Sequence, residues 1–189
     1  MRSIKLKLAV AMVLVLLLGT VGQVGADGKS LYLLNMGSGL GSGLYSYDIQ
    51  GNTLVYQVKS DILNASNAVG LALDEDSQYL FITYESQNYI NVYNANTMVY
   101  ETQATASGAS NLAGVFVEQA THKVYAVDRN LGKLYVYAWD GAAKTLTNLI
   151  TSNPYYLTLK NTSGVDVTGT YGVSIDEENN RLYIGMMAN

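Results

Sequence analysis

The fold of this chain is decided by residues 69–104, which read VGLALDEDSQYLFITYESQNYINVYNANTMVYETQA. The stretch holds four short runs rich in apolar, β-branched and aromatic residues, and polar turns such as Asp74-Glu-Asp-Ser77 separate them. Its first two runs are apolar at consecutive positions, which is typical of strands covered on both faces of their sheet. The pattern therefore predicts an all-β fold in which four short antiparallel strands form one module.

The beginning of this module recurs twice further along the chain. A glycine, a mainly apolar run and an acidic residue appear as Gly70-Leu-Ala-Leu-Asp74, Gly114-Val-Phe-Val-Glu118 and Gly172-Val-Ser-Ile-Asp176. The glycines are 44 and then 58 residues apart, and the aromatic residues Phe81, Tyr125 and Tyr183 of the following run keep the same spacing. Repeats of about 45 residues are typical of β-propeller blades, which bury their faces only by stacking on one another. We therefore predict a β-propeller made of four-stranded antiparallel blades.

The repeats divide residues 27–189 into four units. They are a partial blade 30–58 without a first strand, a blade 69–104, a blade 114–149 and a partial blade 172–187 without its last two strands. Propellers typically close with about four to eight blades, so we expect an incomplete ring and a truncated product of a longer gene. The alternatives are a small ring closed by the N- and C-terminal strands, or a ring completed by other chains. Open flanks would expose apolar surface, so we expect self-association through the exposed blade edges.

The N-terminus has the pattern of a secretory signal peptide. Three basic residues lie within the first seven, the apolar run of residues 8–18 follows, and Val24-Gly-Ala26 supplies the small residues of a cleavage site. As a helix the apolar run would extend about 16 Å, against about 30 Å for the hydrocarbon core of a bilayer. We therefore predict a signal peptide over residues 1–26, no membrane span after cleavage, and a protein that is secreted or held in the cell envelope.

The net charge limits the classes of partner, and the lack of cysteine limits how an exported form can be stabilised. The formal net charge is −4 for the full chain, and it becomes −7 without residues 1–26, which carry three basic residues and no acidic ones. Nucleic acid and anionic lipid are therefore poor partners. The chain has no cysteine, so an exported form relies on core burial rather than on disulfides.

Two stretches resemble known propeller repeats. Residues 79–93, YLFITYESQNYINVY, resemble the YVTN-type repeat of archaeal and bacterial surface-layer proteins. The stretch from Val124-Tyr-Ala-Val-Asp128 through Asp140-Gly141 is similar also to the related NHL and YWTD repeats. The signature tetrapeptide reads Phe81-Ile-Thr-Tyr84 and Tyr125-Ala-Val-Asp128 in place of the consensus. The resemblance covers residues 30–187, and it implies a propeller with an envelope or adhesive role.

Seven residues are candidates for ligand binding. They lie in the loops before the first strands and between the second and third strands, where first strands converge on the channel of a propeller: Asn67, Asn111, Tyr171, Glu85, Asn88, Arg129 and Asn130. The segment 151–170 accounts for the extra length of the last repeat on the same face, and an enlarged loop there favours a functional role. The alternative is that each candidate is an ordinary polar loop residue.

We expect three further features, the acidic turns, His122 and the glycine-rich segment, to have structural rather than catalytic or ligand-binding roles. The acidic turns Asp74-Glu-Asp76 and Asp176-Glu-Glu178 lack the ligand alternation and closing glutamate of an EF-type calcium loop, so we expect solvated turns. His122 lies in the same turn of another repeat, and no spacing places a serine or an acid beside it, so we expect a surface histidine. The glycine-rich residues 37–43 join two strands, which favours a hairpin loop over a phosphate-binding loop.

Two sequons and a single tryptophan complete the candidates. Asn64 and Asn161 begin the sequons Asn64-Ala-Ser66 and Asn161-Thr-Ser163, which lie on the same predicted face. They are candidate glycosylation sites, and the alternative is that the sequons are chance matches. Trp139 is expected to end a third strand, and one tryptophan is too few for the quinone-binding propellers. We expect no catalytic residue, no metal and no cofactor, because no nucleophile–base pair or ligand set is placed by spacing.

These features give one leading hypothesis and two alternatives. The leading hypothesis is an exported, non-catalytic propeller that binds protein or glycan as a surface-layer scaffold or adhesive module of the cell envelope. The first alternative is a metal-dependent, lactonase-type hydrolase with its ion at the channel mouth. The second is an accessory binding domain of a larger extracellular enzyme.

Overall fold

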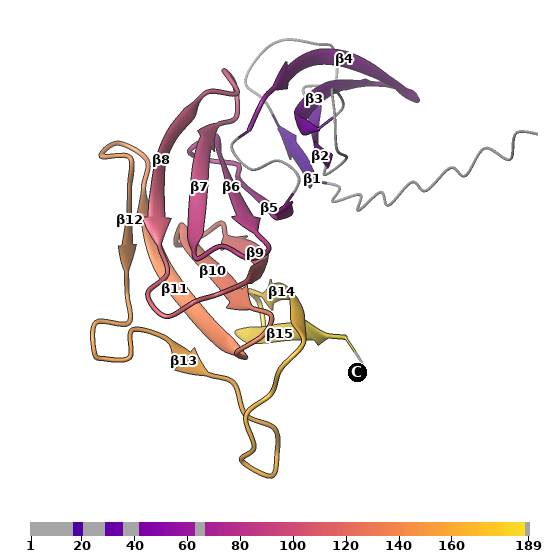
Figure 1. Cartoon of the computed structure of the whole chain (residues 1–189). Helices are drawn as coiled ribbons and strands as arrows, with labels where there is room; N and C mark the ends of the chain where they lie inside the picture. Colours follow the sequence, from indigo (N-terminus) through magenta and orange to yellow (C-terminus); the bar gives the residue numbers. More distant parts are fainter. Residues whose placement is uncertain (1–16, 21–28, 36–41, 63–66, 188–189) are drawn as a thin grey trace, which may run out of the picture.

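The computed structural model describes residues 17–20, 29–35, 42–62 and 67–187. These residues form fifteen β-strands and no α-helix, and they are arranged in four successive antiparallel sheets (Figure 1). No helix with the length and apolar character needed to cross a membrane occurs in this part of the chain. The predicted all-β fold of four-stranded antiparallel sheets is confirmed.

We call the four sheets blades 1 to 4. Blade 1 consists of β1 (Leu17–Thr20), β2 (Lys29–Asn35), β3 (Gly43–Gln50) and β4 (Thr53–Ser60). Blade 2 consists of β5 (Ala68–Asp74), β6 (Tyr79–Tyr84), β7 (Tyr89–Asn94) and β8 (Tyr100–Thr105). Blade 3 consists of β9 (Leu112–Glu118), β10 (Lys123–Asp128), β11 (Lys133–Asp140) and β12 (Thr145–Asn148), with the short β13 (Leu157–Thr158) added to β11. Blade 4 consists of β14 (Thr170–Asp176) and β15 (Arg181–Met186). Among the described residues these blades do not close into a ring.

Two strands differ from the units expected from the sequence. β1 pairs with β2, with Leu17 opposite Tyr32, so blade 1 has a first strand where none was predicted. An apolar segment can pair with the backbone groups of an open strand edge, which repeat analysis does not detect. β1 also lies inside the predicted signal peptide, whose residues 1–16 and 21–26 are outside the described part of the chain. The second strand, β13, attaches the 151–170 segment to blade 3.

The turn after each first strand is held in the same way in blades 2, 3 and 4. In each turn the acidic residue accepts a hydrogen bond from the side chain three positions later: Asp74 from Ser77, Glu118 from Thr121, and Asp176 from Asn179. The bond from Thr121 lowers the pKa of Glu118, because it favours the ionised carboxylate. The acidic turns therefore have a structural role, although the expectation of a solvated turn is wrong for Asp74, which is fully buried.

Aromatic and aliphatic side chains fill the space between blades 2 and 3. The Trp139 ring lies 4.9 Å from the Tyr79 ring and 5.4 Å from the Phe81 ring, in edge-to-face geometry. Tyr137 is buried in the same cluster, and burial raises its pKa to about 12. A separate buried cluster joins blades 1 and 2, with Leu44 and Leu80 among its members. The interface between blades 1 and 2 and the interface between blades 2 and 3 thus bury apolar runs that the sequence placed in the first three strands of a blade.

The repeated glycines allow neighbouring first strands to approach closely. A Cβ atom on Gly70 would lie 2.4 Å from the carbonyl oxygen of Ala113, and one on Gly114 would lie 2.6 Å from the carbonyl oxygen of Tyr171. At Gly172, the equivalent position of blade 4, a Cβ atom would meet nothing within 4 Å. Glycine is therefore needed where another blade packs against the first strand, as it does at Gly70 and Gly114.

The flank of blade 4 is open to solvent in the described structure. Leu182, Tyr183 and Met186 of β15 are 38%, 52% and 55% exposed. The corresponding strand of blade 2, β6, is buried along its whole length. The difference arises because β6 lies between two other blades, whereas among the described residues β15 has a neighbouring blade on one side only.

Candidate functional site

Three of the seven predicted binding residues meet at one end of the blades. Glu85 follows β6 of blade 2, Arg129 follows β10 of blade 3, and Tyr171 lies near the start of β14 in blade 4. Arg129 Nη1 lies 2.7 Å from Glu85 Oε1, and the Tyr171 hydroxyl donates to the same oxygen at 3.1 Å. The guanidinium carbon of Arg129 stands 4.9 Å from the centre of the Tyr171 ring. We call this group the Glu85 cluster.

The repeat explains why the Glu85 cluster forms. Glu85 and Arg129 are 44 residues apart, which is the spacing of the repeat, so they occupy equivalent positions in adjacent blades. Opposite charges at equivalent positions are brought together when the blades stack. Sequence spacing placed both residues on one face, and the structure adds that they pair directly.

The cluster is partly open to water. The side chains of Arg129 and Glu85 are 32% and 33% exposed. Desolvation, followed by the charge of Glu85, raises the pKa of Tyr171, so its phenol stays protonated and donates to the carboxylate. Partly exposed ion pairs of this kind contribute about 1 kcal/mol or less to stability. The arrangement therefore orients polar groups at the surface more than it stabilises the fold.

A buried carboxylate that sequence reasoning missed holds the loops beneath the cluster. Asp128 is fully buried, and its Oδ2 atom accepts from the backbone N–H groups of Ser110 (2.6 Å) and Asn111 (3.1 Å). Its Oδ1 atom accepts from the N–H groups of Asn130 and Leu131, both at 2.9 Å. Asp128 thus fixes the loop that carries Arg129 and the loop before β9. An aspartate at the end of an apolar strand and before Arg-Asn is a turn signal that could have identified it.

The other four predicted residues do not join the cluster through their side chains. The carbonyl groups of Asn67 and Asn88 accept hydrogen bonds from the N–H groups of Glu85 and Ala106, and the Asn130 N–H binds Asp128. Asn111 is 9% exposed, and its Oδ1 atom is buried without a hydrogen-bond partner among the described residues. These residues shape the loops by their backbones, while Glu85, Arg129 and Tyr171 present the side chains.

A narrow cavity lies beside the cluster where the first strands converge. Its volume is about 200 Å³, and it is lined by Gly70, Gly114 and Gly172 with their neighbours and by Tyr171. Small-molecule sites usually have volumes of about 300–1,000 Å³. The cavity is therefore small for a whole ligand, and the exposed side chains of the cluster offer the larger contact surface.

The structure corrects the expectation for His122. Its Nδ1 atom lies 2.8 Å from Oδ2 of the buried Asp74 in blade 2, although no spacing argument placed an acid there. The Ser77 hydroxyl donates to the same carboxylate at 2.7 Å, and Trp139 Nε1 donates to Ser77 Oγ at 3.1 Å. The serine donates to the aspartate and not to the histidine, so this is not the geometry of an activated nucleophile. The network links blades 2 and 3 at the end opposite the Glu85 cluster.

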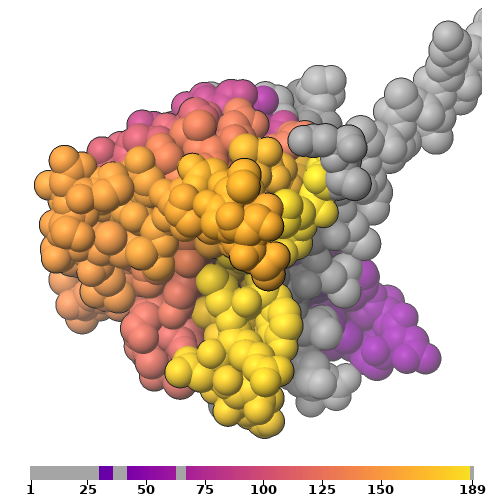
Figure 2. Space-filling model, turned by 90° about the horizontal axis from the view of Figure 1, so that it is seen from below, coloured from indigo at the N-terminus to yellow at the C-terminus, as the bar shows by residue number. Residues whose placement is uncertain are grey.

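The enlarged 151–170 segment packs on blade 3. The Tyr156 ring lies 5.7 Å from that of Tyr135, and the Lys133 ammonium stands 4.1 Å above the Tyr156 ring. The segment then forms a hairpin over residues 159–167, closed by a bridge between Lys160 and Asp166. Figure 2 shows this segment beside the yellow strands of blade 4.

Several sequence predictions fall outside the described residues or on this hairpin. The sequon at Asn64 and most of the glycine-rich residues 37–43 lie outside the described part of the chain. Asn161 is exposed at the tip of the hairpin, and its use as a glycosylation site stays a prediction. Among the described residues, no group of three or more His, Cys, Asp or Glu side chains is placed to hold a metal ion.

Comparison with known proteins supports the fold and gives no family. No protein-family model matches the chain, and no curated protein sequence matches it. A chain of the nidogen/laminin complex matches with a TM-score of 0.57 and 15% identity, over 92% of this chain and 57% of that chain. A candidate 6-phosphogluconolactonase from Bacteroides fragilis matches with a TM-score of 0.52 and 16% identity, over 67% of this chain and 36% of that chain. Another from Bacteroides uniformis matches with a TM-score of 0.53 and 11% identity, over 89% of this chain and 53% of that chain.

These matches assign the architecture. The matched structures are β-propellers, so the stacked blades described above are β-propeller blades. At identities of 11–16% the likeness concerns the fold alone. The chain spans 36–57% of the length of the matched proteins.

Proposed function

We propose that this chain is an exported, non-catalytic β-propeller that serves the cell envelope as a surface-layer scaffold or adhesive module and binds protein or glycan. The observation that carries the proposal is the convergence of Glu85, Arg129 and Tyr171 from three successive blades on one partly exposed surface. Arginine and tyrosine are the residue types that most often dominate binding energy at protein interfaces. The signal-peptide pattern supports the export part of the proposal.

The chemistry of the cluster favours a polar ligand rich in hydrogen-bonding groups. A guanidinium carries five N–H donors in a planar fork, and in Arg129 the Nη1 group binds Glu85. The carboxylate of Glu85 supplies acceptor capacity, and the Tyr171 ring supplies an apolar surface beside both charges. Sugar hydroxyls and peptide groups match such a mixture of donors, acceptors and an aromatic face. The match to a chain of a nidogen/laminin complex adds support for protein binding.

Replacing Arg129 with alanine is expected to weaken binding by about tenfold or more, because the ligand loses charged donors at the centre of the site. The full chain is first screened against a glycan array and a displayed peptide library, and the affinity for the selected ligand is then measured for each variant. Lys144→Ala is the matched control, since Lys144 also pairs with a glutamate, Glu101, at the opposite end of the blades. The proposal predicts an affinity within about twofold of wild type for this control. Unchanged affinity in Arg129→Ala would contradict the proposal.

The hydrolase alternative is favoured by the two Bacteroides matches, which are candidate 6-phosphogluconolactonases. In that function Glu85 would be the carboxylate at the channel mouth, although Arg129 would oppose a divalent cation there. Turnover of 6-phosphogluconolactone by the full chain with added divalent metal, lost in Glu85→Gln, would replace the binding proposal. An accessory domain of a larger enzyme would bind through the same surface.

A further inference from the structure

Charge is divided unequally between the two ends of blades 2 to 4. We call the end that holds the Glu85 cluster the cluster end, and there the second strands end and the third strands begin. It carries three acidic and three basic residues: Glu85, Asp128, Asp166, Arg129, Lys133 and Lys160. The opposite end of these blades carries nine acidic residues and three basic ones, Lys123, Lys144 and Arg181. The excess negative charge of these blades therefore lies away from the Glu85 cluster.

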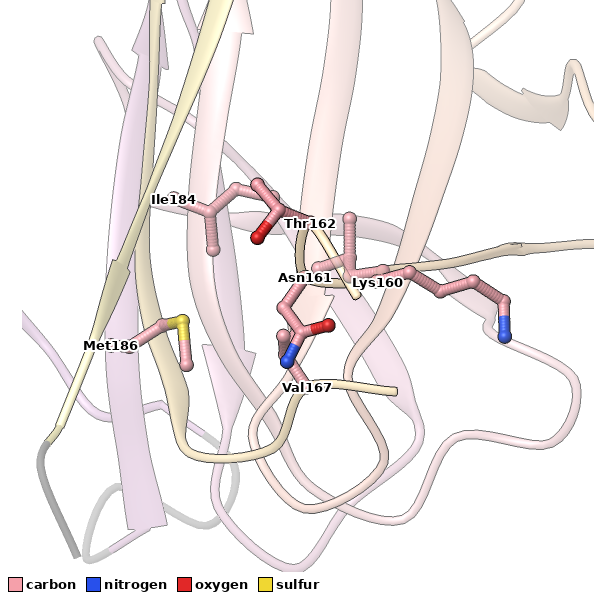
Figure 3. Close-up of a pocket in the computed structure, with 7 residues that line it drawn as sticks. Lys160, Asn161, Thr162, Val167, Ile184 and Met186 are labelled. Atoms are coloured by element: carbon pink, nitrogen blue, oxygen red, sulfur yellow. The ribbon is translucent and has the colours of Figure 1, made fainter. Parts of the chain in front are cut away.

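The charged side chains at the cluster end have partners within the chain. Besides the ion pair of the Glu85 cluster, the Lys160 ammonium pairs with Asp166 at 2.6 Å on the hairpin of residues 159–167. Figure 3 shows the Lys160 side chain on this hairpin, extended away from β15. The Lys133 ammonium donates to the carbonyl group of Gly108 at 2.8 Å, and the buried carboxylate of Asp128 accepts from four N–H groups. This end thus offers a charged ligand no unbalanced charge.

The ion pair of the cluster leaves donors and an acceptor beside each other. The Oε1 atom of Glu85 accepts from Arg129 Nη1 and from the Tyr171 hydroxyl. Among the described residues, no hydrogen bond reaches Glu85 Oε2 or the Nε and Nη2 groups of Arg129. Two neighbouring hydroxyl groups of a sugar match this pair, because one can donate to the carboxylate and the other can accept from the guanidinium.

The loops around the cluster present uncharged polar groups. Exposed serine, threonine and asparagine residues surround it: Ser86, Asn88, Ser107, Ser110, Asn130 and Thr168. In the loops 85–88, 106–111 and 129–132, Leu131 is the one large apolar residue that is exposed. The buried centre of a protein–protein interface is usually more apolar than this. The hydroxyl and amide groups of these loops therefore favour a glycan over a protein as the ligand.

We propose that the ligand of the Glu85 cluster is an uncharged glycan. Glu85 and Arg129 bind two neighbouring hydroxyl groups of one sugar, and the sugar ring lies beside the Tyr171 ring. An acidic group on the ligand would lie against the carboxylate of Glu85, and an amino group would lie against the guanidinium of Arg129, so either charge is opposed at the site. This inference rests on the function proposed above, since it names the class of ligand for the same site.

The glycan array and peptide library used with the full chain test the inference when acidic, sulfated and amino sugars are included in the array. The glycan that binds most tightly is expected to be uncharged. Its affinity is expected to change by about twofold or less when NaCl rises from about 0.05 to about 0.5 M, because no net charge is screened. The deoxy derivative that lacks one of the two neighbouring hydroxyl groups is expected to bind about tenfold more weakly.

Glu85→Gln tests the role of charge at the site. This variant keeps the size of the side chain but leaves Arg129 without a counter-charge. The carboxylated derivative of the selected glycan is therefore expected to gain about fivefold in affinity relative to its uncharged parent. Glu101→Gln is the matched control, because Glu101 pairs with Lys144 at 2.6 Å at the opposite end of the blades. The ratio of the two affinities is expected to stay at its wild-type value in this control, and an unchanged ratio in Glu85→Gln would overturn the inference.

The outcomes separate this inference from the proposed function. Binding that is unchanged in Arg129→Ala would contradict the function proposed for the cluster. Binding that depends on Arg129 but selects an acidic glycan, an amino sugar or a peptide would leave that function in place and show that the uncharged-glycan inference is wrong. A full chain that binds none of the glycans or peptides would contradict both.

Discussion

Asp128→Ala is expected to lower the free energy of unfolding by about 4 kcal/mol. The carboxylate of Asp128 is fully buried and accepts hydrogen bonds from four backbone N–H groups in two loops. Each buried donor left without a partner costs about 1–3 kcal/mol, although water can reach part of the exposed loops and reduce the sum. Urea denaturation followed by far-UV circular dichroism measures the loss, and the slope with denaturant checks that the unfolded state is unchanged.

Asp140→Ala provides the matched control for this prediction. The Oδ1 atom of Asp140 also accepts from two backbone N–H groups, those of Ala142 and Ala143, but Asp140 is exposed. Water can replace the lost acceptor there, so a loss of about 1 kcal/mol or less is expected. Losses of similar size in the two variants would show that Asp128 does not organise the loops in the way described.

Gly114→Ala is expected to cost about 2 kcal/mol, because the added methyl group collides with backbone atoms that cannot move away easily. The new Cβ atom would lie 2.6 Å from the carbonyl oxygen of Tyr171 and 3.0 Å from the Cα atom of Gly172. Both atoms belong to the first strand of blade 4, so blades 3 and 4 would have to separate. Overpacking of a well-packed interface typically costs about 1–3 kcal/mol. The midpoint of thermal or urea unfolding gives the measured value.

The same substitution at Gly172, the equivalent position of blade 4, should not destabilise the protein. A Cβ atom at Gly172 meets nothing within 4 Å, and alanine in a strand restricts the unfolded chain more than glycine does. Gly172→Ala is therefore expected to be neutral or to stabilise the protein by up to about 1 kcal/mol. A destabilisation equal to that of Gly114→Ala would mean that the repeated glycines serve their own strands and not the contact between blades.

Much of the fold was predictable because its signals are local and repeated. The glycine-led runs, the polar turns and the spacing of Phe81, Tyr125 and Tyr183 define the strands without any knowledge of long-range contacts. The same spacing placed Glu85 and Arg129 at equivalent positions on one face, and Tyr171 at the start of the next blade. Once the blades stack, these three side chains meet.

The contacts that were not predicted depend on packing between blades. The partner of His122 is Asp74, 48 residues earlier, and the two turns meet only after stacking. In the sequence alone, Asp128 is recognisable only as the last residue of a signature tetrapeptide. Its role in holding two loops is seen only in the structure, where four backbone N–H groups donate to its carboxylate. Tyr156 and β13 fold the 151–170 segment onto blade 3, where the sequence indicated only an enlarged loop. In each case the decisive partner lies on another strand or blade and leaves no periodic pattern in the sequence.

The most direct test of the account is a nuclear Overhauser effect between the α-protons of Gly114 and Gly172 in the isotope-labelled full chain. Gly172 pairs with Gly185 inside blade 4, so a Gly172–Gly185 effect serves as the internal reference for a folded blade. The stacking of glycine-led blades predicts a clear Gly114–Gly172 effect beside that reference. If the reference appears and the Gly114–Gly172 effect is absent, blades 3 and 4 do not pack through their first strands, and the account is wrong.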